Sequence, residues 1–594
     1  MLRNKKTWFV ATMILCGAVS GPKAPADGPA KNVILMVADG AGFNTFDAAA
    51  MYLGRWDPQA RRSKLVYDGP GWHRYACTTY PLSLVRLPFA AGNAEWRLPA
   101  PGGGTALQIE LRWNPAQTSW LVYHPGKAWD TRALLGISAA GFRGYTWLRT
   151  TPTDSAAAAT ALACGIKTYN GAINWSAADR PLLGQTLAQI AKARGKAVGV
   201  VTTVPWSHAT PAGLGGAHNR SREAYAEIAN EMLAAPYLDI IMGAGHPEFD
   251  NNGRPLAPPP EAESKPAEAS KTANPAPFSK NQAKPPKRET KYVGGPATWL
   301  LLRQGKHPAG WRLIQTREEF QALAEGKGPP IEPGPSPRIK LLGTAQAATT
   351  LQQRRGKYQD SDTPFSQPLN PNVPSLATMV RGALRALSAD SDGFYLAIEG
   401  GAVDWANHSN QAARMVEEQV DFLRAVETVV QWVETHSRWD ETLVIITADH
   451  ETGLIWGPQS DRIAYQPIED RGEGNLPGLK YNSTGHSNSL VPLYARGPGS
   501  QRLAALVDGQ DPTAAAKWGF SGQYVDNTDV FTVCRAALDP EATKTQNPTT
   551  EAGRREAPGP QATTTVDAQT EARPGAPPKP SARPPARQEQ SRPR

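Results

Sequence analysis

The sequence predicts an α/β fold built around a mostly parallel sheet. Continuous apolar, β-rich runs such as Asn32–Ala38 (NVILMVA) and Thr442–Ala448 (TLVIITA) are typical of strands buried on both faces. Helix-forming stretches, among them the alanine-rich run Ala156–Ala163, lie between such runs, as helical crossovers between parallel strands require. With 594 residues, 40% of them hydrophobic, the chain can bury a large core in one α/β domain or in several.

The first 20 residues are expected to be a signal peptide. They begin with basic residues, continue with an apolar run from Trp8 to Val19, and have small residues at Ala18 and Ser20. A membrane anchor is the alternative, but the apolar run is short for a span and no stop-transfer pattern follows. We therefore expect an exported protein, periplasmic or secreted, with no membrane span and a short linker over residues 21–30.

The net charge of +9 does not by itself indicate a nucleic-acid partner. Basic residues recur in the Pro-rich stretches Lys280–Lys291 and Arg554–Arg594 and not on a periodic helix face, so no specific nucleic acid is expected. Residues 255–291 and 541–594 lack the aliphatic residues needed for a core, which predicts a disordered insertion and a disordered tail. The basic tail is one route to cell-surface association. Residues 81–119, rich in Pro, Gly and Trp, predict a β-rich insertion to which the sequence assigns no role.

Polar residues follow four of the predicted strands at the points where these strands end. Because the carboxyl ends of parallel strands meet at one edge of a sheet, we expect these residues to assemble a ligand site. A fifth predicted strand, Leu238–Met242, ends in glycine and proline instead. The four strands and their polar ends are Asn32–Ala38 with Asp39, Ala197–Thr203 with the loop of His208 and Thr210, Gly393–Ile398 with Glu399, and Thr442–Ala448 with Asp449 and His450.

Helices are expected between these strands. One runs from Pro181 to Arg194 with Gly195 as its C-cap, and another opens at Ala217-His218-Asn219-Arg220. A third runs from Ser375 to about Leu387, and a long amphipathic helix is expected over residues 402–436.

Ser155 is expected in the first turn of the alanine-rich helix. Thr153 and Asp154 are good N-cap residues, and Pro152 prevents an earlier start. The unpaired N–H groups and the dipole at a helix N-terminus favour an alkoxide or a bound phosphate. Ser155 is thus either a nucleophile or an ordinary capping residue, and this segment alone does not decide between them.

Residues with metal-binding side chains favour the first of these interpretations. Asp404 and His408 stand at i and i+4, so on a helix they share one face and can hold one ion. Mixed imidazole and carboxylate ligands suit Zn²⁺, and carboxylates with a hydroxyl such as that of Thr210 suit Mg²⁺. Arg220 is a candidate for forking two phosphate oxygens. The candidate ligands are Asp39, Thr210, Glu399, Asp404, His408, Asp449, His450 and His486.

Seven segments, taken in order, resemble the bacterial alkaline phosphatases of the metal-dependent alkaline phosphatase superfamily. They are VADGAG, PTDSAAAATALACGIKTYNGAI, SHATPAG, AHNR, IEGGAVDWANH, TADHETG and TGHSN, spread over residues 31–499. The resemblance implies a three-layer α/β/α sandwich with a large, mostly parallel central sheet, and a catalytic domain over residues 31–540. It also implies hydrolysis of small phosphate monoesters. Many members of the family are dimers, so a homodimer is compatible with it.

The resemblance also implies a role for each candidate residue. Ser155 corresponds to the nucleophile that forms a phosphoserine intermediate, and Arg220 to the phosphate clamp. The implied metals are two Zn²⁺ and one Mg²⁺. Asp404, His408 and His486 would hold the first zinc; Asp39, Asp449, His450 and Ser155 the second; and Asp39, Thr210 and Glu399 the magnesium.

Two positions depart from the family pattern. His208 stands where some members have an acidic residue that orders water around the magnesium, and Trp405 stands where some have a lysine or histidine near the phosphate. The sequence therefore predicts that a cation is missing near the site. The alternatives to a phosphomonoesterase are a phosphodiesterase of the same superfamily and an inactive surface-binding module. The CxPxR-type context of sulfatases and the GxSxG elbow of serine hydrolases are not found.

Overall fold

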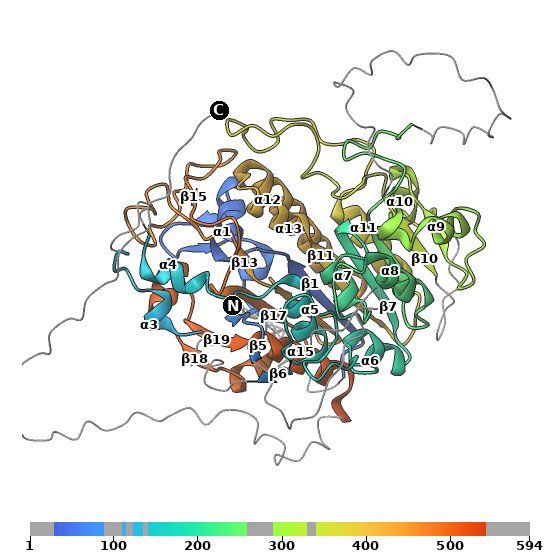
Figure 1. Cartoon of the computed structure of the whole chain (residues 1–594), viewed down its shortest axis with the longest axis horizontal. Coiled ribbons are helices and arrows are strands. Elements are labelled where there is room, and N and C mark those ends of the chain that lie inside the picture. Colours follow the sequence, from blue (N-terminus) through green and yellow to red (C-terminus); the bar gives the residue numbers. More distant parts are fainter. Residues whose placement is uncertain are drawn as a thin grey trace, which may run out of the picture. The chain divides into compact units, whose positions relative to one another are not determined.

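The computed structural model describes residues 29–82, 84–87, 110–113, 123–134, 141–257, 289–328 and 340–541 (Figure 1). The predicted signal peptide 1–20 and tail 541–594, apart from Glu541, lie outside these residues, as does most of the predicted insertion 255–291. Within the predicted insertion 81–119, residues 84–87 (β5) and 110–113 (β6) form an antiparallel pair. The division of the chain into these segments stays a prediction.

An eleven-stranded sheet forms the centre of the described structure, and from β12 to β9 every strand is parallel to its neighbours. β17 runs antiparallel to both of its neighbours, while β19 is parallel to β4. A large, mostly parallel sheet is therefore confirmed. The strand order is β18 (Gly509–Gln510), β19 (Gln523–Asp526), β4 (His73–Thr78), β17 (Val491–Arg496), β12 (Thr442–Thr447), β1 (Asn32–Ala38), β11 (Phe394–Gly400), β7 (Ala197–Pro205), β8 (Ile240–Ala244), β10 (Leu341–Thr344) and β9 (Arg312–Ile314).

β1 lies in the middle of this order because it can be buried on every side. All seven of its residues are buried, and it pairs with β11 on one edge and β12 on the other. The predicted strand runs at Ala197–Thr203, Leu238–Met242, Gly393–Ile398 and Thr442–Ala448 all form strands of this sheet. The continuous apolar pattern thus identified strands that have no solvent-facing side.

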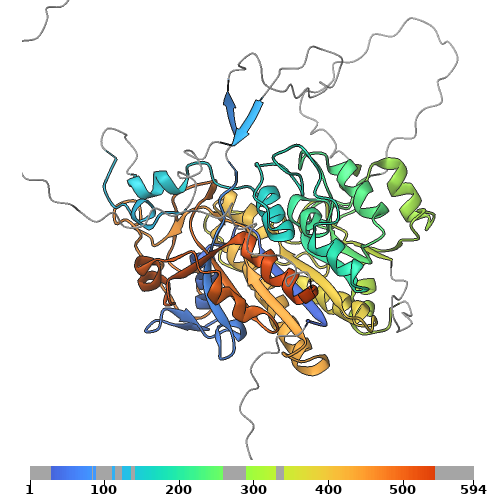
Figure 2. The same ribbon diagram turned by 90° about the horizontal axis from the view of Figure 1, so that it is seen from below.

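Two groups of helices pack on the sheet and give the three layers that the resemblance implies (Figures 1 and 2). In one group α15 contacts β1 and β12, and α6 contacts β7 and β11; in the other, α13 contacts β1 and β11, and α11 contacts β7. The first group is α5 (Ser155–Cys164), α6 (Leu187–Ala193), α7 (Ala209–Leu214) and α15 (Asn527–Leu538). The second is α1 (Phe43–Tyr52), α10 (Arg317–Ala324), α11 (Leu376–Leu387), α12 (Ala402–His408) and α13 (Ala412–His436).

Shorter elements surround these layers. Small antiparallel pairs join β13 to β16 and β14 to β15 beside the sheet, and β2 to β3 near the start of the chain. The remaining elements are β2 (Trp56–Asp57), β3 (Arg62–Ser63), β13 (Glu451–Thr452), β14 (Ile455–Trp456), β15 (Lys480–Tyr481), β16 (His486–Ser487), α3 (Pro125–Ala128), α4 (Arg143–Leu148), α8 (Tyr225–Ala234), α9 (Pro296–Arg303), α14 (Pro512–Trp518) and the 3₁₀ turns η1 (Val66–Asp68), η2 (Thr290–Val293) and η3 (Ser500–Ala505).

Three helix predictions need correction. The helix expected from Pro181 begins at Leu187, because Thr186 and Gln189 form a capping box there. No helix opens at residues 217–220; Asn219 instead bridges to Ile173, and the next helix begins at Tyr225. The long helix expected over residues 402–436 is two helices, since Asn410 adopts a left-handed φ of 52° between them.

Candidate metal and nucleophile site

Ser155 is the first residue of α5, and its helix is capped by the residue before it. The Asp154 side chain accepts a hydrogen bond from the N–H of Ala157, and Gly165 ends the helix in the left-handed conformation. Ser155 is therefore not the cap, which removes the simplest structural explanation for a serine at this position. Its side chain is buried, and its Oγ lies 3.2 Å from Nε2 of His450.

His450 belongs to a buried group at the carboxyl ends of β1 and β12. Its Nε2 lies 3.5 Å from Oδ1 of Asp39 and 3.2 Å from Oδ2 of Asp449, and all three side chains are fully or almost fully buried. One ligand atom from each residue falls within 4.8 Å of the others. The backbone N–H groups of Gly40 and His450 donate to Oδ1 of Asp449, which leaves its Oδ2 facing the histidine. This group, with Ser155, is the set predicted for the second zinc.

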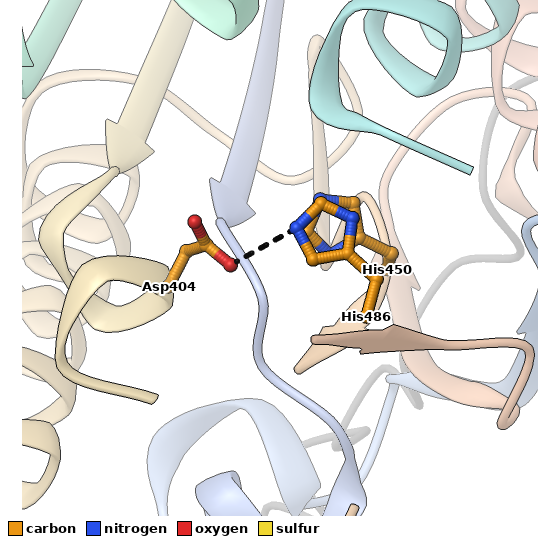
Figure 3. Close-up of side chains that lie close together, drawn as sticks. All are labelled: Asp404, His450 and His486. Atoms are coloured by element: carbon orange, nitrogen blue, oxygen red, sulfur yellow. Dashed lines mark ion pairs between the residues drawn. The ribbon is translucent and has the colours of Figure 1, made fainter. Parts of the chain in front are cut away.

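Asp404, His408 and His486 form the second group, and Figure 3 shows Asp404 with His486 and His450. Nε2 of His408 lies 3.3 Å from Oδ2 of Asp404 and 3.0 Å from Nε2 of His486, whose Nε2 is 3.5 Å from Oδ1 of Asp404. Ligand atoms of a tetrahedral zinc, each 2.0–2.1 Å from the ion, lie roughly 3.3 Å apart. The spacing of this group is therefore close to that of a zinc site. The His450 and His486 rings stack at 3.6 Å, so the two groups are adjacent.

His408, His450 and His486 all direct Nε2 toward the other candidate ligands. Nδ1 of His408 lies 2.6 Å from the Thr484 carbonyl oxygen, Nδ1 of His486 lies 2.7 Å from that of Thr153, and Nδ1 of His450 lies 3.3 Å from the Thr452 hydroxyl. A carbonyl or hydroxyl partner at Nδ1 fixes the ring and leaves Nε2 free to bind a metal.

A third group consists of oxygen donors beside Asp39. Oδ2 of Asp39 lies 3.4 Å from the Thr210 hydroxyl, which α7 carries on its first turn. Glu399, at the end of β11, accepts a hydrogen bond from Thr202 on β7, and its charge acts on Asp39. Carboxylates with a hydroxyl are the donors that suit magnesium. Thr202 was not among the predicted site residues.

Buried carboxylates in these groups have too few positive partners within the protein. Burial and the charges of Asp449, Asp404 and Glu399 raise the pKa of Asp39 well above its ordinary value. Burial raises the pKa of Glu399 to about 7 and that of Asp449 to about 6. Oδ1 of Asp39, Oδ2 of Asp449 and Oε1 of Glu399 are buried without any hydrogen-bond partner. Orphaned buried oxygens that face one another are what divalent cations would satisfy, so these residues fit the metals predicted for them.

The group around Asp404 is electrostatically different. Burial disfavours the charged carboxylate, but its hydrogen bond with His486 and the neighbouring histidines hold the pKa of Asp404 well below its ordinary value. Burial likewise opposes the charged form of His486, yet its hydrogen bond to Asp404 and the Asp404 charge raise the pKa of His486 to about 9. Burial and the nearby positive groups His486 and His408 hold the pKa of His450 well below its ordinary value.

Arg220, the predicted phosphate clamp, and Arg222, which was not predicted, have different partners. Arg220 forms a two-pronged ion pair with Asp179, at 2.7 and 3.0 Å, above the ring of Trp175, and its side chain is half exposed. Arg222 instead pairs with Asp154 at 3.0 Å, its side chain 18% exposed, and its charge acts on Asp39 and His450. Arg220 was predicted to be the phosphate clamp because it is the arginine of the AHNR motif. A turn that begins at Ser221 places Arg222 beside Asp154, the residue before Ser155, and the Arg222 N–H donates to the Gly171 carbonyl.

His208 and Trp405 lie together beside these groups. Their rings meet edge to face at 5.3 Å, and Nδ1 of His208 is buried with no hydrogen-bond partner. Burial, together with the charges of Arg222, Lys291 and Arg354, lowers the pKa of His208 to about 3. The guanidinium carbon of Arg354 lies 4.6 Å from the centroid of the Trp405 ring, so a cation packs on Trp405 itself. That a cation is missing near the bound phosphate stays a prediction.

A serine at a helix N-terminus, facing buried histidines and carboxylates at the carboxyl edge of a mostly parallel sheet, is the arrangement that the resemblance to the alkaline phosphatase superfamily implies. The chain belongs to the alkaline phosphatase family, whose model matches residues 144–267 and 338–501. No helix in the described residues has the length and apolarity needed to cross a membrane.

Relatives of the chain carry the same family name. Alkaline phosphatase 3 of Bacillus subtilis is 29% identical over 307 residues, which cover 51% of this chain and 49% of that protein. Alkaline phosphatase 4 of the same organism is 28% identical over 421 residues, which cover 60% of this chain and 74% of that protein. The chain thus spans about half the length of the first relative and three quarters of the second. The solved structure of Thermus thermophilus alkaline phosphatase is 20% identical, with a TM-score of 0.49 over 89% of this chain and 96% of the other.

Proposed function

We propose that the protein is an exported, metal-dependent phosphomonoesterase that hydrolyses small phosphate monoesters through a phosphoserine on Ser155. The observation that carries this proposal is the 3.2 Å approach of Ser155 Oγ to His450 Nε2, within a group of buried ligands. A serine hydroxyl alone is a weak nucleophile near neutral pH, so a nucleophilic role needs the activation that this group can provide.

The same three groups would hold the metals. Asp404, His408 and His486 would bind one Zn²⁺, and Asp39, Thr210 and Glu399 would bind Mg²⁺. Asp39, Asp449 and His450 would bind a second Zn²⁺ together with Ser155. When bound, such ions lower the pKa of hydroxyl groups that they contact and stabilise charge that develops on phosphate oxygens.

The protein residues position the substrate and carry the phosphoryl group. Ser155 Oγ attacks phosphorus as the bond to the ester oxygen breaks, and the leaving alcohol departs with a proton. Water then cleaves the bond between Ser155 Oγ and phosphorus, which regenerates the serine and releases phosphate. The N-terminus of α5 offers N–H groups and a favourable dipole to the phosphate oxygens throughout.

Arg222 replaces Arg220 as the proposed phosphate clamp. Its guanidinium is held by Asp154, the residue next to the nucleophile, and has donors left for two phosphate oxygens. Arg220 uses its donors on Asp179 at the surface.

Turnover of p-nitrophenyl phosphate tests the proposal. Wild-type protein should lose activity in a chelator and regain it with Zn²⁺ and Mg²⁺, and Ser155→Ala should be inactive while Ser388→Ala, an exposed serine at the end of α11, retains activity. Wild-type-like turnover in Ser155→Ala would sink the mechanism. A preference for bis(p-nitrophenyl) phosphate over the monoester would indicate the phosphodiesterase alternative, and no turnover of either would indicate a binding module.

A further inference from the structure

A cavity of about 310 Å³ is lined by residues of α10, of α13 and of the loop that leads into α11, and by no candidate metal ligand. Its volume lies within the range of pockets that bind small organic molecules. Phe365, Val373 and Pro374 contribute apolar surface to it, and Glu418 and Asp421 of α13 contribute carboxyl groups. An apolar lining with a few polar groups is typical of such pockets.

Glu418 carries a carboxyl group that the protein leaves without a partner. The residue is 4% exposed, and its Oε1 has no hydrogen-bond partner among the described residues. Its neighbour Glu417 is the reverse, because it pairs with Arg355 at 2.8 Å and with Arg414 at 2.9 Å. The two buried arginines therefore neutralise Glu417, while Glu418 has no ion pair of its own in the described part of the chain.

Asn370 has an unused donor on the same cavity. The residue is 5% exposed, and its Oδ1 accepts a hydrogen bond of 3.1 Å from the Asn372 N–H. Its Nδ2 lines no such contact and has no partner within the residues described. Because buried polar groups are normally hydrogen-bonded, an unpaired donor and an unpaired acid on one cavity indicate a ligand that supplies both partners.

Two arginines, Arg317 and Arg424, also line the cavity, and both are exposed. Arg317 donates to the Pro371 carbonyl at 3.1 Å, and the guanidinium carbon of Arg424 lies 5.9 Å from the centroid of the Phe365 ring. Exposed charges are solvated and contribute little to the stability of a neighbouring charge. The exposed groups of the lining are thus positive, while Glu418 is buried and acidic.

The surroundings of Glu418 determine when it is charged. Burial and the charges of Asp421 and Glu417 raise its pKa to about 8, although Arg355 and Arg414 oppose this shift. In the protein alone, Glu418 therefore keeps its proton at neutral pH. A cation beside the carboxyl group would favour its ionised form, so binding of a cation and ionisation of Glu418 reinforce each other.

We propose that this cavity binds a small protonated amine that carries hydroxyl groups. The ammonium would contact the Glu418 carboxylate, with Asp421 adding negative charge, and a hydroxyl oxygen would accept a hydrogen bond from Asn370 Nδ2. A metal ion fits less well, because within the described residues the groups of three close metal-binding side chains are those of the candidate site. The inference is independent of the proposed function.

Isothermal titration calorimetry of the full chain with glucamine (1-amino-1-deoxysorbitol) tests the inference. Sorbitol is the neutral analogue, with a hydroxyl in place of the ammonium. At pH 8.5, in a buffer without amines, Glu418 is mostly ionised and an aliphatic amine keeps its proton. The wild type should bind glucamine saturably and sorbitol at least roughly tenfold more weakly, the size of one charge-assisted hydrogen bond.

Glu418→Gln should weaken glucamine binding at least roughly tenfold. Unfolding would not explain this loss, because removing an unpaired buried acid is expected to stabilise the protein, and denaturant unfolding checks this. Leu369→Trp, a change at an exposed residue of the lining, should also weaken binding by filling part of the cavity. Glu434→Gln removes the same charge from an exposed position of α13 and is the matched control, which should bind glucamine like the wild type.

Equal glucamine binding by the wild type and Glu418→Gln, equal affinity for glucamine and sorbitol, or no saturable binding by the wild type would overturn the inference. Glucamine binding that inorganic phosphate abolishes would also overturn it, because the amine would then occupy the candidate active site. Glu418→Gln should turn over p-nitrophenyl phosphate like the wild type, so none of these outcomes affects the proposed phosphomonoesterase.

Discussion

Asp154 and Arg222 form a 3.0 Å ion pair that joins the residue before the candidate nucleophile to a turn 68 positions later in the chain. The same Asp154 carboxylate caps α5 through its other oxygen and accepts a hydrogen bond from the Gly171 N–H. One side chain therefore sets both the start of the helix and the position of the arginine.

Arg222→Ala is expected to lower kcat/KM for p-nitrophenyl phosphate roughly 10- to 100-fold and to weaken inhibition by inorganic phosphate, because charge-assisted hydrogen bonds to the phosphate are lost. Arg220→Ala is the paired comparison and should stay within about twofold of wild type. It should change the free energy of unfolding by less than about 1 kcal/mol, since its ion pair is half exposed. A larger loss of kcat/KM in Arg220→Ala than in Arg222→Ala would indicate that Arg220 is the phosphate clamp.

The two functions of Asp154 can be separated by comparing Asp154→Asn with Asp154→Ala. Both variants lose the charge that holds Arg222, so both should raise the phosphate inhibition constant severalfold. Only the alanine variant also loses the helix cap, which should cost about 1 kcal/mol of stability in denaturant unfolding. Equal destabilisation of both variants would show that the Asp154 side chain does not stabilise α5 as its N-cap.

Asp449→Asn is expected to stabilise the metal-free protein by roughly 1 kcal/mol while reducing its zinc content. Oδ2 of Asp449 is buried without a hydrogen-bond partner and its charge repels that of Asp39, so replacing the carboxylate removes repulsion that a metal would otherwise balance. Thermal unfolding in chelator and metal analysis after dialysis measure the two effects. A metal-free variant less stable than wild type would show that repulsion between these carboxylates is not significant.

Stability should depend on pH through Glu418, a buried residue of α13 that lies outside the site. Burial and the charges of Asp421 and Glu417 raise its pKa from 4.5 to about 8, although Arg355 and Arg414 oppose the shift. Between these values the folded protein keeps a proton that the unfolded chain releases, so this group makes the protein less stable as pH rises.

Glu418→Gln removes this dependence and should therefore gain roughly 1–3 kcal/mol relative to wild type between pH 6 and pH 8.5. Denaturant unfolding at the two pH values gives the difference. Glu434→Gln, an exposed glutamate on the same helix, should show no such gain. A gain equal in both variants would mean that burial of Glu418 is not its cause.

Strand cores and strand ends were predictable because they depend on local pattern. The apolar run at Asn32–Ala38 is buried throughout, and Asp39 follows it at the expected edge. β4 and β17 were not predicted, since their pairing is set by neighbours distant in sequence. The break between α12 and α13 at Asn410 was also missed, because one residue with a left-handed φ does not change the spacing of the apolar residues.

The ligand groups were predictable for a similar reason, since Asp404 and His408 share a helix turn and Asp449 and His450 end one strand. The proposed phosphate clamp Arg222 and the packing of Arg354 on Trp405 were not predictable. Arg220 and Arg222 are two residues apart, and their partners, Asp179 and Asp154, are decided by a turn and not by the motif. Arg354 stands far from every motif, so only tertiary packing on Trp405 reveals it.

The bond from His486 Nδ1 to the Thr153 carbonyl oxygen spans 333 positions of the chain. On the ribosome, the strands from β1 to β12 are all made before His486 emerges, whereas the ligand group around Asp404 lacks one member until then. The proposed phosphatase activity would thus require synthesis to pass this residue. A chain that ends before β16 would have most of its sheet but would lack His486 from the ligand group around Asp404.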